Sequence, residues 1–165
     1  MAPVPGVRER VAAFVAHEYG KVVAAVTLAT RDRDRAEDAV QDALVAALSS
    51  DTPPDNVAAW VTVTAINHVR MAHRRSGAQA RAYAKLPPEP EQMDDATGQV
   101  VDSLTVHDAV AALPDGQQQI VTLYYYLDTP VADIAQALGV TTGTVKTQLH
   151  RARSALGSTL GKEAP

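Results

Sequence analysis

Basic and hydroxyl side chains gather in one segment near the end of the sequence, residues 142–156. No Asp or Glu occurs between Asp133 and Glu163, so the charged side chains of this segment are all basic. A helix that begins with small hydroxyl residues can approach a DNA backbone closely, donate N–H groups to phosphate and place the next side chains against base edges. An ordinary solvated face of an amphipathic helix is the alternative interpretation. The predicted DNA contacts are Thr142, Thr144, Lys146, Thr147, His150, Arg151 and Arg153.

A helix-turn-helix is predicted to position these side chains. Residues 131–138 carry apolar side chains at helical spacing, and Gly139 stands where a tight turn needs a positive φ. We expect Val140 to fill the angle between the two helices, and Thr141 or Thr142 to cap the second helix. The second helix is expected to end near Leu156. Its inward residues are expected to be Val145, Leu149, Ala152 and Leu156.

Another predicted helix, residues 35–48, is amphipathic and has an acidic outer face. An apolar periodic stretch, residues 14–28, precedes it, and residues 31–34 break the chain between the two. Carboxylates near a helix start complement the helix dipole, which explains part of the acidic pattern. The residues that lie largely outside the apolar stripe are Glu37, Asp38, Gln41, Asp42 and Val45.

A third segment, residues 56–75, combines helical spacing with positive charge. Residues 56–88 contain no carboxylate, although the whole chain has a net charge of −4. Such clustering of one sign is the electrostatic footprint of binding to a phosphate backbone. Opening a DNA duplex also requires that an extruded base be captured, and Asn67 and Arg70 are the polar candidates for that contact. Trp60 is predicted to anchor the core rather than to stack on a base.

Length and composition predict an all-α protein of two small helical domains. The chain has 165 residues, of which 46% are hydrophobic and only 4% aromatic, and this favours helix packing through Ala, Val and Leu. We expect domains at residues 7–76 and 104–160. Residues 77–103, with their Pro, Gly and acidic residues, are expected to form a flexible acidic linker.

Several kinds of function are not indicated by the sequence. It has no Cys, which excludes disulfides and thiolate metal sites, and it lacks the basic and apolar pattern of a signal peptide. We therefore predict a cytoplasmic protein. No metal-ligand motif, Gly-rich phosphate loop or nucleophile constellation is visible, so no metal, no cofactor, no small-molecule substrate and no independent enzymatic activity is predicted.

Short motifs occur along both halves of the sequence. The C-terminal half contains, in order, Leu113-Pro114, Asp133-Ile134-Ala135, Leu138-Gly139-Val140, Gly143-Thr144-Val145-Lys146 and Arg151-Ala152-Arg153. The N-terminal half contains Glu37-Asp38, Gln41-Asp42, Ala59-Trp60, Ile66-Asn67 and Arg74-Arg75. In order and spacing these motifs resemble regions 4 and 2 of bacterial sigma factors, in particular the small extracytoplasmic-function group. Response regulators contain similar helix-turn-helix domains, so the N-terminal motifs decide between the two families.

The resemblance implies a protein that binds core RNA polymerase and directs promoter-specific initiation, while catalysis stays with the core enzyme. It implies docking on the clamp helices of the largest subunit through Asp38, Gln41 and Asp42, and contact with the flap of the second subunit. The DNA-binding helix at the C-terminus would read the −35 element of promoter DNA. An anti-sigma factor that inserts between the domains is a further implied partner, which no residue identifies. The residues implied to read and open the −10 element are Asn67, Arg70, His73, Arg74 and Arg75.

Some positions depart from the pattern of the sigma family. Met71 stands where the family usually has Asp, and Gly116, Gln117 and Gln118 replace an arginine-rich helix start. These departures leave an alternative open, a sigma-like decoy that binds an anti-sigma factor or another regulator without initiating transcription. A stand-alone DNA-binding regulator is the second alternative, and it does not explain a domain that resembles a polymerase-docking module.

Overall fold

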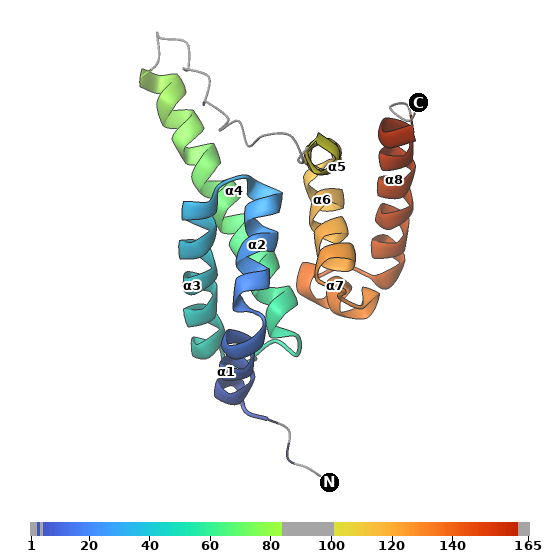
Figure 1. Ribbon diagram of the computed structural model, residues 1–165. Helices are drawn as coiled ribbons and strands as arrows, with labels where there is room; N and C mark the ends of the chain where they lie inside the picture. The colour runs from blue at the N-terminus through green and yellow to red at the C-terminus, as the bar shows by residue number, and fades with distance from the viewer. Residues whose placement is uncertain (1–2, 4, 84–100, 162–165) are drawn as a thin grey trace.

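The computed structural model describes residues 3, 5–83 and 101–161, and within them every regular element is a helix. The all-α prediction is therefore confirmed for this part of the chain. Figure 1 shows two groups of helices side by side. The N-terminal group contains α1 (Val7–His17), α2 (Tyr19–Thr30), α3 (Arg33–Ser49) and α4 (Val57–Tyr83). The C-terminal group contains α5 (Val101–Ala111), α6 (Asp115–Val121), a π-helical turn (Thr122–Tyr126), α7 (Val131–Leu138) and α8 (Thr142–Gly161).

The apolar stretch at residues 14–28 is divided between two helices. The chain leaves the helical conformation at Glu18, where φ is −124° and ψ is −12°, and the axes of α1 and α2 differ by 74°. This bend brings Val11 and Phe14 of α1 into the same core as Val22 and Val26 of α2. Helical spacing alone did not reveal the break, because the apolar residues on both sides of it face one core.

Helix α3 begins two residues before its predicted start, at Arg33, and buries its apolar stripe as expected. Asp32 is its N-cap, and the Asp32 carboxylate accepts the backbone N–H of Arg35 at 3.1 Å. Small side chains on the inner face let α2, α3 and α4 approach closely, because Ala36, Ala39 and Ala43 are all buried. The opposite, outer face of α3 is exposed to solvent.

The helix-turn-helix has the predicted turn with one difference. Gly139 adopts φ 68°, and the N–H groups of Gly139 and Val140 close the end of α7 on the carbonyls of Gln136 and Ala135. Val140 does not fill the angle between α7 and α8, because its side chain is 41% exposed. Ile134 fills that space instead and packs on the inner face of α8.

Helix α8 is capped and buried as the sequence predicts. The Thr141 hydroxyl accepts the backbone N–H of Thr144 at 3.1 Å. The predicted inward residues Val145, Leu149 and Ala152 are buried, and Leu156 is partly buried against the cluster that contains Ala152. The helix continues beyond that residue to Gly161.

The two groups of helices share an apolar cluster. Ala59 and Val63 of α4 pack with Ile120, Leu123 and Ile134 of the C-terminal group. Helix α4 also continues past its expected end to Tyr83, and the central part of the expected linker, residues 84–100, lies outside the described residues. No single helix among the described residues is long and apolar enough to span a membrane, and only the sharply bent pair α1 and α2 passes that test together.

Candidate nucleic-acid interface

The predicted −35 residues all lie on the open side of α8. Each of their side chains is exposed in the structure. Thr144, Thr147 and Arg151 are spaced i, i+3, i+7 and therefore form one stripe, and a second stripe runs through Lys146 and His150. Figure 1 shows α8 at the edge of the molecule, away from α1 to α4. The exposed face of α8 is thus free of protein contacts from the N-terminal group and carries both hydroxyl and basic side chains.

Arg153 lies apart from the first stripe and is held by two tyrosines. Its Nε donates to the Tyr125 hydroxyl at 2.5 Å, and its guanidinium lies 5.6 Å from the Tyr124 ring centre and 5.7 Å from that of Tyr125. The hydrogen bond with Tyr125 raises the pKa of the Arg153 guanidinium. Nothing in the sequence indicates this contact, because it depends on how the π-helical turn places Tyr125 opposite α8.

The predicted −10 residues share α4, but the structure gives them different partners. Asn67, Arg70 and Arg74 follow one another at i, i+3, i+7 and form one stripe. Arg70 is only 12% exposed, and its guanidinium donates to Gln118 Oε1 at 2.6 Å and to the Asp115 carbonyl at 3.3 Å. Burial lowers the pKa of Arg70, and the nearby Asp115 carboxylate opposes that effect. The −10 stripe of the N-terminal group is therefore in contact with the C-terminal group.

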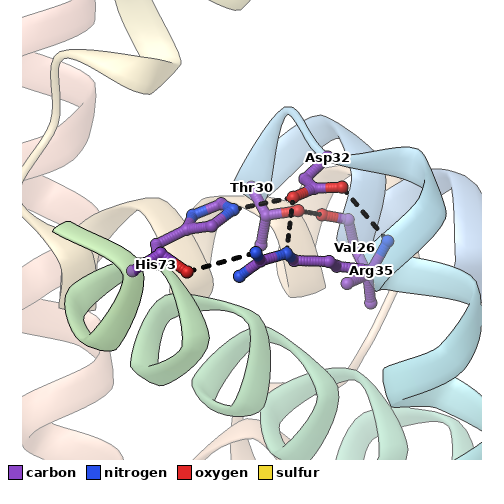
Figure 2. A network of polar contacts seen from close by, with 6 residues as sticks. Val26, Thr30, Asp32, Arg35 and His73 are labelled. Carbon is purple, nitrogen blue, oxygen red and sulfur yellow. Dashed lines mark hydrogen bonds and ion pairs between the residues drawn. The ribbon is translucent and has the colours of Figure 1, made fainter. Parts of the chain in front are cut away.

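His73 faces its own helical group rather than the −10 stripe. Its Nε2 lies 2.8 Å from Oδ2 of Asp32, the residue that caps α3 (Figure 2). Arg35 lies on the other side of that carboxylate, with its Nε 3.5 Å away, and also donates to the Ser76 hydroxyl at 3.2 Å. The network ties the C-terminal half of α4 to the turn between α2 and α3. A DNA contact by His73 stays a prediction.

The ionisation of Asp32 depends on the same network. Burial alone would raise the pKa of Asp32. The hydrogen bonds from the His73 ring and the Arg35 backbone N–H, together with the charges of the His73 and Arg35 side chains, lower that pKa overall. A carboxyl whose pKa is lower in the folded state stabilises the fold above its unfolded pKa of about 3.9. That contribution is lost as the pH falls through the lower, folded-state value.

We expect Asp32→Ala to lower the free energy of unfolding by about 1 kcal/mol, because an N-cap is lost. Thermal or urea unfolding at pH 7 measures the change. Asp32→Asn is the matched variant, since Asn caps a helix as well as Asp but carries no charge to pair with His73. An Asp32→Ala variant as stable as the parent would show that this cap contributes nothing.

The predicted docking residues lie together on the outer face of α3. Asp38, Gln41 and Asp42 are exposed, and the Tyr19 hydroxyl lies 3.4 Å from the Gln41 amide nitrogen, which donates to it. The sequence placed Val45 on this outer face but did not indicate that Leu48 is exposed beside it. Val45 is 63% exposed and Leu48 is 46% exposed, and they continue the same side of the helix. The surface therefore combines an acidic half with an apolar half. The helical spacing of Val45 from Asp38 and Gln41 indicates in the sequence that Val45 lies on this face.

Comparison with known proteins identifies the class of protein that these surfaces belong to. Residues 103–156 match the family model for sigma-70, region 4. The chain is 33% identical over 138 residues to the ECF RNA polymerase sigma factor SigM of Mycobacterium tuberculosis, covering 81% of this chain and 68% of SigM. It is also 33% identical over 138 residues to the sigma factor SigL of the same organism, covering 79% of this chain and 77% of SigL.

The fold agrees with that class. The solved structure of the sigma factor RpoE in complex with the anti-sigma factor NepR from Bartonella quintana matches with a TM-score of 0.66. The match covers 88% of this chain and 93% of RpoE at 22% sequence identity. The chain belongs to the extracytoplasmic-function family of RNA polymerase sigma factors. The predicted role as a promoter-directing factor of RNA polymerase is confirmed at the level of the family.

Proposed function

We propose that three surfaces of this chain divide the work of a sigma factor between them. The acidic and apolar face of α3 docks on the clamp helices of core RNA polymerase. The open face of α8 reads the −35 element, and the basic stripe of α4 reads and opens the −10 element. Bond formation stays with the core enzyme, so the chain itself is not an enzyme and acts in the cytoplasm, where polymerase and promoter DNA are found.

The observation that carries this proposal is the separation of charge between helices. The carboxylates of the docking face lie on α3, whereas α4 and α8 contain no Asp or Glu at all. A protein that must bind both an acidic polymer and a protein partner gains from such segregation, because each surface attracts one partner and repels the other. The net charge of −4 suits a factor whose DNA affinity comes mainly through the polymerase.

The domain boundaries at residues 7–76, 77–103 and 104–160 belong to the same proposal. The first range contains α1 to α3 and most of α4, and the last contains most of α5, all of α6 and α7, and all but the last residue of α8. The residues between would connect the two DNA-reading surfaces while both are bound on the polymerase. The flap of the second subunit is the proposed contact of the C-terminal domain, and an anti-sigma factor is a proposed regulator.

Transcription in vitro tests the function directly. Purified sigma-free core polymerase is supplied with fragments of the host genome, with and without this chain. We expect discrete new transcripts whose start sites share −35 and −10 elements. If no transcripts form where another sigma factor works, initiation is excluded and a decoy that binds regulators becomes the better account.

A further inference from the structure

An exposed methionine lies among the polar residues of α4. Met71 is 49% exposed, and among the described side chains of α4, residues 57–77, it is the one large apolar side chain that is exposed. Residues one helical turn away from it lie on the same side of the helix. Those neighbours are all exposed and polar, and they are Asn67, His68, Arg74 and Arg75. Met71 is therefore surrounded by groups suited to nucleic acid and not by other apolar side chains.

The position of Met71 distinguishes it from an ordinary exposed apolar residue. Single apolar side chains are common on protein surfaces and by themselves indicate no function. Met71, however, belongs to a helix without Asp or Glu and lies one turn from both Asn67 and Arg75. Arg75 Nη2 donates to the Met71 sulfur at 3.5 Å, which places a positive charge directly beside the thioether. DNA whose phosphates are held by the arginines of this side of α4 would bring its bases against Met71.

The chemistry of the thioether limits what Met71 can recognise in DNA. A methionine side chain donates no hydrogen bond and accepts one only weakly, so it cannot read the polar groups of a base edge. The base feature that apolar side chains contact is the 5-methyl group of thymine in the major groove. A carboxylate at the same place would instead accept a hydrogen bond from the N4 amino group of cytosine. Met71 is thus suited to thymine among the pyrimidines.

We propose that Met71 is a specificity-determining residue of the −10 surface, which favours thymine at one position of the −10 element by van der Waals contact with its 5-methyl group. This inference rests on the proposed role of α4 in reading the −10 element. Burial of one methyl group corresponds to about a fourfold change in affinity, which sets the size of the expected preference. The inference also accounts for an apolar residue where the sigma family usually has Asp.

A promoter library measures the preference with the complete holoenzyme. A promoter recovered by transcription in vitro is altered so that each position of its −10 element carries each of the bases in turn, and the transcripts from the mixture are counted. We expect Met71→Ala to lower the preference for thymine over cytosine about fourfold at one position and to leave the others unchanged. Met71→Leu keeps an apolar side chain of similar size and should keep the preference.

Changes of a single methyl group on the DNA identify the contact. Deoxyuridine in place of thymidine removes the 5-methyl group and alters nothing else on the base. We expect uracil at the selected position to reduce open-complex formation by the parent about fourfold. The same substitution should have no effect on Met71→Ala, because the side chain that meets the methyl group is already absent. Such non-additivity between a protein change and a DNA change indicates direct contact.

Val106→Ala is the matched control, because Val106 is also an exposed apolar side chain, at 45%, but lies on α5. This variant should respond to uracil as the parent does. Equal use of thymine and uracil by the parent at every −10 position would overturn the role of Met71. An undiminished uracil effect in Met71→Ala would overturn it as well. Absence of all transcription by the parent would refute the proposed function itself and this inference with it, and that failure is recognised before any substituted promoter is tested.

Discussion

Replacing Asp38 and Asp42 with lysine is expected to abolish stable association with core RNA polymerase while leaving the helical fold intact. Both carboxylates are exposed and lie on the outer face of α3, so their loss removes no internal hydrogen bond that the structure contains. Placing two positive charges at a docked interface built for negative ones costs several kcal/mol, which corresponds to about a hundredfold or greater loss of affinity. Gel filtration or fluorescence titration with purified core polymerase measures the loss of affinity.

The matched control for this charge reversal is Glu18→Lys/Asp51→Lys. These two carboxylates are also exposed in the N-terminal group, and they lie just before the start of α2 and just after the end of α3, outside the set of predicted docking residues. The control changes the net charge by the same amount and should bind the core normally. Normal core binding by the Asp38→Lys/Asp42→Lys variant would move the docking surface away from this face of α3.

Val45 and Leu48 form the apolar half of the docking face. Exposed apolar side chains beside an acidic patch are typical of a protein interface, in which a desolvated centre is surrounded by polar groups. The sequence placed Val45 outside the buried stripe of α3, but the exposure of Leu48 became visible only with the packing. The polar part of this site and Val45 were thus predictable from motif and spacing, whereas the exposure of Leu48 was found from the structure.

Local features of the chain were predictable because their causes are local. The turn at Gly139 needs a positive φ, and the Thr141 cap needs a hydroxyl next to free N–H groups, so both were present in the sequence. The buried stripes of α3 and α8 follow from helical spacing in the same way. The prediction for Val140 was wrong, because the backbone hydrogen bond that closes the turn leaves its side chain in solvent.

Features that join distant segments were not predictable in this way. The contacts of Arg70 with Gln118 and of His73 with Asp32 span 48 and 41 residues. Spacing within α4 places Asn67, Arg70 and Arg74 on one stripe, but it contains no information about which helix covers them. Gln118 was noted in the sequence only as a missing arginine, and its partner Arg70 on α4 became apparent from the fold.

The seven predicted −35 residues are not expected to contribute equally, and alanine variants of α8 can separate them. Arg151→Ala should weaken binding to a duplex carrying the −35 element by about 1–3 kcal/mol if Arg151 contacts a base. Lys146→Ala should weaken binding to all duplexes alike and reduce the salt dependence by about one phosphate contact. Fluorescence anisotropy over a series of salt concentrations distinguishes the two results. Lys21→Ala is the control, since it removes one exposed positive charge from α2.

Arg153 provides the internal comparison for this series. Its guanidinium is already bonded to the Tyr125 hydroxyl and lies over two tyrosine rings, on the flank of α8 away from Arg151. A side chain that must give up those contacts to reach DNA gains less from the exchange, so Arg153→Ala should weaken −35 binding less than Arg151→Ala does. Equal losses for the two arginines would show that the tyrosines orient Arg153 toward DNA. Unchanged binding by both Arg151→Ala and Lys146→Ala would remove the open face of α8 as the −35 surface.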